Sequence, residues 1–207
     1  MIPSPRILAL AAVILCACAV RYASTSTDAG SSRRVQASRV RIVFRAESDS
    51  FSRARDEYEA LWRSEGGRIV EVMERVSGIR FDSPPYADTL IGAIVFEGVS
   101  NSGYRDTPMQ LRASYPADTK REALVHELGH RLQTGVARGE DEHEVLFLWL
   151  YDAWVELWGK EFADAQVLVE RARRGPYPAA WDAALALDSA GRAARWRSLR
   201  DRPRRPD

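Results

Sequence analysis

The chain has 207 residues, with 30 basic and 29 acidic side chains and three histidines. A net charge of +1 gives no electrostatic case for nucleic-acid binding, which depends on an excess of lysine and arginine. Both cysteines, Cys16 and Cys18, lie near the amino terminus, so disulfides play no part in the rest of the chain.

The amino-terminal segment, residues 1–20, resembles a bacterial export signal. One basic residue, Arg6, precedes a mostly apolar run that is short for a membrane span and suits a secretory signal. Residues 15–18, Leu-Cys-Ala-Cys, resemble a lipobox, in which Cys18 would carry the lipid after cleavage. Cleavage near Ala23 is the alternative. We therefore expect an exported protein of the bacterial cell envelope or periplasm, either lipid-anchored to the membrane through Cys18 or free.

Composition divides the remaining chain into three parts. Residues 21–39 are rich in Ser, Thr, Ala and Gly and predict a flexible tether. Residues 40–200 are long enough for one domain with a sizeable core. Residues 201–207 form a basic tail, which we interpret as a solvated end rather than a nucleic-acid site.

The first half of the domain mixes strand and helix patterns. Residues 39–45 and 109–115 alternate apolar with polar side chains, and residues 90–97 are rich in Ile and Val, so all three predict strands. Residues 51–76 keep a helical period that a Gly-Gly pair interrupts, which predicts a kinked helix or two stacked helices. Gly78 is expected to end this helical segment.

The second half reads as helical. Amphipathic patterns cover residues 140–158, 162–174 and 178–188. Five tryptophans are expected to pack its core: Trp149, Trp154, Trp158, Trp181 and Trp196. The sequence therefore predicts an α+β fold, with a small mixed or antiparallel sheet packed on helices and a mostly helical carboxyl-terminal half.

The chemical centre of the sequence is residues 126–130, His-Glu-Leu-Gly-His. Two histidines four apart lie on one face of a helix and can share a metal ion, with Glu127 beside them. Thr119 and Glu122 match a capping box that would start this helix, and Gly135 is a plausible stop.

A third ligand is expected from the returning helix. A short turn makes the two helices antiparallel, and a rise of about 1.5 Å per residue brings residues 142–147 level with the histidine pair. His143 and Glu142 both lie in this window and off the polar stripe, and His143 is favoured because neutral imidazole is the commoner ligand. Glu144 lies on the polar stripe, and Asp152 and Glu156 should overshoot.

The chain resembles the zincin superfamily of metallopeptidases in three features. Glu127 lies between paired histidines on a predicted helix, an alternating strand precedes this helix, and a third ligand is expected from the helix that follows. The resemblance covers residues 109–158 and is closest to small single-domain bacterial members. It implies Zn²⁺ on His126 and His130, with Glu127 as general base, and substrate held along the edge strand by backbone hydrogen bonds. The chain departs from gluzincins, whose Glu ligand lies further downstream, and from metzincins, because position 136 is Val.

Together these features predict a zinc metallopeptidase that acts on a peptide or protein substrate. His126, His130 and His143 would hold the ion, and Glu127 would take a proton from the attacking water. The oxyanion donor stays open among Tyr104, Tyr115 and Tyr151. The alternative is an exported, membrane-tethered protein with a zincin fold that binds or scaffolds without proteolysis.

Overall fold

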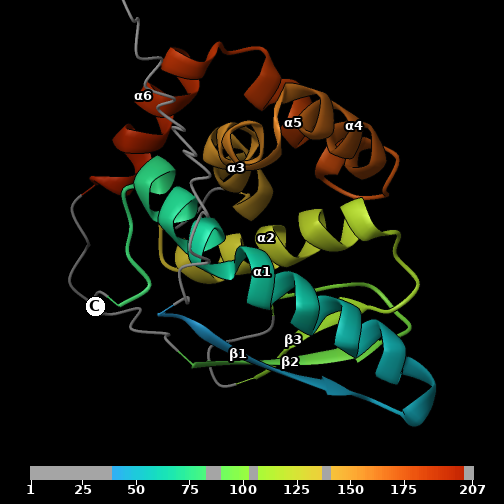
Figure 1. The fold of residues 1–207 in the computed structure, drawn as a ribbon. Helices are drawn as coiled ribbons and strands as arrows, with labels where there is room; N and C mark the ends of the chain where they lie inside the picture. The colour runs from blue at the N-terminus through green and yellow to red at the C-terminus, as the bar shows by residue number, and fades with distance from the viewer. Residues whose placement is uncertain (1–38, 83–89, 103–106, 137–140, 203–207) are drawn as a thin grey trace, which may run out of the picture. The chain divides into compact units, whose positions relative to one another are not determined.

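A computed structural model describes residues 39–82, 90–102, 107–136 and 141–202 of this chain (Figure 1). Its elements, in chain order, are β1 (Arg41–Ala46), a short 3-10 turn (Asp49–Phe51), α1 (Ser52–Ser77), β2 (Leu90–Phe96), β3 (Met109–Arg112), α2 (Ala117–Leu132), α3 (Glu142–Trp158), α4 (Lys160–Arg171), α5 (Tyr177–Leu185) and α6 (Ser189–Arg200). The α+β class is confirmed.

The predictions for both ends of the chain lie outside the described residues. They concern the signal in residues 1–20, lipidation at Cys18, nearly all of the tether and most of the basic tail. Across the described ranges, no helix is both long and apolar enough to cross a membrane.

The expected mixed or antiparallel sheet is wrong, because all three strands run parallel. The order is β1-β2-β3, with Phe44 opposite Ala93 and Val95 opposite Leu111. Helix α1 joins β1 to β2, and such a helical crossover returns the chain in the same direction. Residues 97–108 join β2 to β3 and are also long enough for a parallel return.

The segment predicted as a kinked helix or two stacked helices forms one helix, so the division into two is wrong. At Gly66 in this helix, an added Cβ would stand 2.8 Å from the indole ring of Trp62. The missing side chain therefore lets that ring lie flat along the helix. As predicted, Gly78 ends the helix, with φ +67 in the left-handed region that glycine adopts without strain.

The helices form two layers above one face of the sheet. Figure 1 shows α1 and α2 over the strands and α3 on their far side, surrounded by α4, α5 and α6. Residues 145–150 at the centre of α3 are all buried, as expected for a helix covered on every side. Four of the five tryptophans are at most 2% exposed and Trp158 is partly buried, so their prediction as core is confirmed.

Candidate metal centre

Helix α2 begins differently from the capping-box prediction. It starts at Ala117, directly after Pro116, and neither Thr119 nor Glu122 caps it. Instead, the Thr119 hydroxyl donates to Oε1 of Gln166 on α4, and Glu122 is fully buried. Both side chains face the protein interior, so α2 enters the core from its first turn. The capping-box residues are present in the sequence, but both side chains make tertiary contacts instead of capping the helix.

The two motif histidines converge as the helix spacing predicts. Nε2 of His126 lies 3.1 Å from Nε2 of His130. Two nitrogens bound to one zinc at about 2.0–2.1 Å in a tetrahedron would lie about 3.3 Å apart, so the pair fits a shared ion. Burial, and then the neighbouring His130, hold the pKa of His126 well below its usual value. Its ring is therefore neutral, which is the form that binds metal.

His143 joins this pair from the first turn of α3. Its ring centroid lies 5.5 Å from that of His126 and 4.8 Å from that of His130. All three side chains offer nitrogens within 4.8 Å of one another, a group that could hold a metal ion. Burial, followed by the two neighbouring rings, lowers the pKa of His143 to about 3, so it too is neutral near pH 7.

Close contact between α2 and α3 brings His143 to the pair. Gly129 sits where an added Cβ would come 2.6 Å from Leu146, so glycine allows the helices to touch. Gln133 then fixes their ends, because its side-chain amide donates to the Glu142 carbonyl at 2.9 Å and accepts from Nε1 of Trp149 at 3.3 Å. Gly129, the fourth residue of the motif, is thus part of the site geometry.

The competing acidic ligands are held elsewhere. Glu142 Oε2 lies 3.4 Å from Nδ1 of His130, on the side of that ring away from His126, and Glu144 is exposed. Asp152 accepts two hydrogen bonds from Arg192, and Glu156 pairs with Arg75. None of these four carboxylates belongs to the three-histidine group.

A carboxylate approaches Nδ1 of each histidine. Besides the Glu142–His130 contact, Glu170 Oε1 lies 2.6 Å from Nδ1 of His126, and Asp141 Oδ1 lies 3.7 Å from Nδ1 of His143. Carboxylates placed behind metal-binding histidines fix ring orientation and leave the other nitrogen for the ion. Asp141 also accepts from two backbone amides as the N-cap of α3.

The most buried part of the site is an acidic pair that the sequence analysis did not identify. Glu122 and Glu170 are both 0% exposed, and Arg173 lies 3.2 Å from the first and 3.8 Å from the second. Burial raises the pKa of both carboxyls; in Glu122 the rise is large and the Glu170 charge adds to it. Glu122 precedes His126 by four residues, so helical spacing could have suggested it. No local pattern pointed to Glu170.

Glu127 lies beside this pair, at 3% exposure. Burial raises its pKa well above the usual range, and the charges of Glu122 and Glu170 add to the rise. Such a carboxylate holds protons more strongly than one in water, as a base that must accept a proton near neutral pH requires.

A tyrosine that sequence reasoning missed lies against two of the three histidines. The ring of Tyr177, at the start of α5, lies 4.4 Å from that of His143 and 6.0 Å from that of His126. The Arg173 guanidinium stands between Tyr177 and Tyr115, 5.5 and 5.7 Å from their ring centres. The phenol of Tyr151 instead donates to Asp164, and Tyr104 lies outside the described residues.

The outer edge of β3 is not free for a peptide, contrary to the expectation from the zincin resemblance. Asn101 exchanges two backbone hydrogen bonds with Gln110, at 2.8 and 3.0 Å. The amide of Arg112 donates to the Ser100 hydroxyl, and its carbonyl accepts from the Tyr58 hydroxyl, each at 3.0 Å. The backbone groups that an added strand would pair with therefore already have partners.

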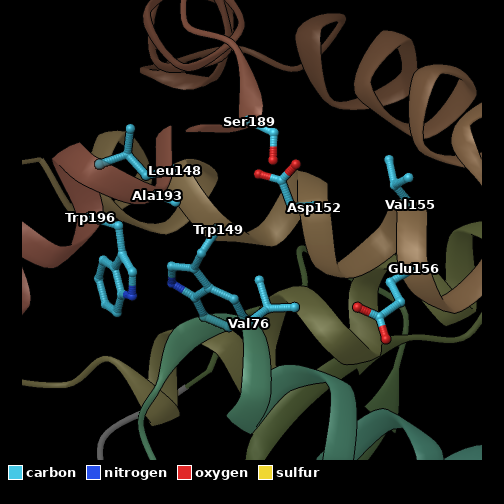
Figure 2. Close-up of a pocket in the computed structure, with 9 residues that line it drawn as sticks. All are labelled: Val76, Leu148, Trp149, Asp152, Val155, Glu156, Ser189, Ala193 and Trp196. Atoms are coloured by element: carbon cyan, nitrogen blue, oxygen red, sulfur yellow. The ribbon is translucent and has the colours of Figure 1, made fainter. Parts of the chain in front are cut away.

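A separate cleft of about 490 Å³ lies between α1, α3 and α6 (Figure 2). Asp152 and the indoles of Trp149 and Trp196 line it, and Asp152 follows His143 by nine residues, half a turn around α3. The cleft thus opens on the opposite side of that helix from the histidines. Its acidic groups are paired with arginines, as described above, so neither carboxylate is available to bind a charged ligand.

Comparison of the chain with protein-family models, with curated proteins and with solved structures found no match in any of the three.

Proposed function

We propose that this chain is a zinc-dependent hydrolase of peptide bonds. The observation that carries the proposal is the convergence of His126, His130 and His143, with the buried Glu127 next to His126 in the chain. Three imidazoles suit zinc, and a set of three protein ligands leaves a fourth position open, as in catalytic rather than structural sites.

In this proposal the ion, when bound, supplies a polarised water and a Lewis acid for the substrate carbonyl. Glu127 accepts the proton of the attacking water and returns it to the leaving amine. The raised pKa of Glu127 suits a group that must both gain and lose a proton. Tyr177 is our choice for the donor to the developing oxyanion, because its ring lies nearer the histidines than those of the other described candidates.

Glu127→Gln tests the proposal most directly. The amide keeps the size of the side chain but cannot accept the proton, so we expect hydrolysis to fall by about 100- to 10,000-fold with zinc content unchanged. Peptide-library hydrolysis and zinc content are measured on the same preparation, with and without a chelator. Retained hydrolysis would remove Glu127 from the mechanism, and lost zinc would make its role structural.

The occupied edge of β3 supports a second candidate, a zinc-holding scaffold that cleaves nothing. An extended substrate would have to displace Asn101 and Ser100 before pairing with Gln110 and Arg112. The same assay distinguishes the two candidate functions, because a scaffold would bind zinc and show no chelator-sensitive cleavage of any peptide.

A further inference from the structure

Behind His126, a continuous line of buried polar contacts runs from α2 through α4 into α5. Nε1 of Trp181 donates to Glu170 Oε2 at 2.7 Å, and Glu170 Oε1 lies 2.6 Å from Nδ1 of His126. All three side chains are at most 1% exposed. The Trp181 indole is itself fixed, because it stacks on Phe147 with centroids 3.9 Å apart and planes within 9°.

A carboxylate so deeply buried is costly unless its charge is compensated. Arg173 lies 3.8 Å from Glu170 Oε1, and the indole N–H occupies Oε2. Oε1 of Glu170 and Nδ1 of His126 have no aligned hydrogen bond, although they are 2.6 Å apart. The two atoms are already within hydrogen-bonding distance, so rotation of the imidazole to point Nδ1–H at this oxygen would complete the bond. The pocket around His126 therefore holds an acceptor for one specific tautomer.

We propose that Glu170 is the positioning residue of the metal centre. It holds the proton of His126 on Nδ1 and so presents Nε2 to the ion, while Trp181 holds Glu170. This inference rests on the proposed function, because it assigns the residues that tune the same ion. The sequence distance between α2 and α4 explains why no motif reveals the contact.

A second cation in place of the Nδ1 proton is the competing interpretation, since Glu122, His126 and Glu170 also form a group that could hold a metal. Two observations disfavour it. The guanidinium of Arg173 already lies within 3.8 Å of both carboxylates, and a further cation would be repelled by it. An ion on Nδ1 together with one on Nε2 would also require His126 to lose its last ring proton. The number of ions bound per chain distinguishes the two.

The experiment measures zinc stoichiometry and affinity by competition with a chelating dye, for the full chain and three variants. We expect one ion per chain and about a 10- to 100-fold loss of affinity in Glu170→Gln, as for other partners behind metal ligands. Trp181→Phe should lose affinity in the same direction but less, since it keeps the carboxylate. Trp196→Phe is the matched control: Trp196 is 2% exposed, and its indole N–H donates to the Ser77 carbonyl and not to Glu170, so affinity should not change.

Replacing zinc with Co²⁺ adds a spectroscopic measurement that a general loss of protein stability would not change. The visible absorption of Co²⁺ reports the arrangement of its ligands, and we expect a changed spectrum in Glu170→Gln and Trp181→Phe but not in Trp196→Phe. If Glu170→Gln does not fold, as judged by circular dichroism of the metal-free protein, Trp181→Phe carries the test.

Unchanged affinity and spectrum in Glu170→Gln would overturn the positioning role while leaving the zinc site intact. Two ions per wild-type chain would overturn it in favour of the second cation. A wild-type chain that binds no zinc would instead overturn the proposed function itself, so the two failures are distinguishable.

Discussion

The carboxylate of Glu142 lies behind the ring of His130, with Oε2 3.4 Å from Nδ1. Glu142 and His143 are adjacent in the sequence and could each have been the third ligand. The structure separates them, since the ring of His143 lies among the other imidazoles and Glu142 approaches from outside. The neighbouring His130 lowers the pKa of Glu142, so this carboxylate is ionised near pH 7.

Substitutions at His143 and Glu142 test which of these two residues is the third metal ligand. We expect His143→Ala to weaken zinc binding by more than about 100-fold, since even an outer partner typically contributes 10- to 100-fold. Glu142→Gln should cost much less, because the Glu142 side chain is 72% exposed. Asp152→Asn is the control: it breaks the pair with Arg192 and should lower the melting temperature without changing zinc affinity. A larger zinc loss in Glu142→Gln than in His143→Ala would reverse the assignment.

Tyr177→Phe tests the proposed oxyanion donor. Removing one such donor typically lowers kcat by about 100-fold or more, and the phenylalanine ring should preserve packing against His143. Zinc content is expected to stay constant. Tyr151→Phe serves as the control, because that phenol donates to Asp164 and should not affect turnover. Equal kcat values for wild type and Tyr177→Phe would exclude the role.

Glu57→Gln tests an ion pair between α1 and α2. Glu57 pairs with Lys120, which is only 5% exposed, and this hydrogen bond lowers the pKa of Glu57 below 4.5. A lowered folded-state pKa stabilises the protein at pH values above 4.5, and this stability is lost as the pH falls through the folded-state value. Because Glu57 is itself 45% exposed, we expect a loss of only about 1 kcal/mol at pH 7.

The measurement is urea unfolding of wild type and Glu57→Gln at neutral and acid pH. The difference in free energy of unfolding should shrink towards zero below the folded-state pKa of Glu57, where the wild-type carboxyl is also neutral. Glu59→Gln is the control, since its exposed pair with Arg63 should contribute within about 0.5 kcal/mol. A difference that persists unchanged in acid would rule out the ion pair as its source.

Gly129→Ala tests the close approach of α2 and α3. Alanine favours a helix over glycine by about 1 kcal/mol, but the new Cβ would lie 2.6 Å from Leu146 in a fully buried position. Overpacking of this kind costs about 1–3 kcal/mol, so we expect net destabilisation together with weaker zinc binding as His143 is displaced. Adding Leu146→Ala should restore zinc affinity. If Gly129→Ala binds zinc as wild type does, the helix contact does not set the site.

The parts of the site that the sequence predicted are those that local periodicity controls. His126 and His130 follow from helical spacing. The prediction of His143 assumed antiparallel helices, and that assumption is wrong, because Figure 1 shows α2 running across the view and α3 nearly end-on. His143 reaches the pair because it lies in the first turn of α3. Glu170 and Tyr177 reach the centre from elements later in the chain, and only tertiary packing brings them there. The prediction of strand direction failed for a related reason. Alternating polarity identifies a strand, but it does not show whether the connection to the next strand makes the pair parallel or antiparallel.

The line from Trp181 through Glu170 to His126 has a consequence for fragments of this protein. A shortened chain ending after α3 would retain all three imidazoles and the neighbouring acid, yet lack the group that sets the tautomer of the deepest ring. Such a fragment would bind metal more weakly than the whole domain and with less regular geometry. During biosynthesis, the high-affinity centre would accordingly form only after the later helices have been synthesised and folded.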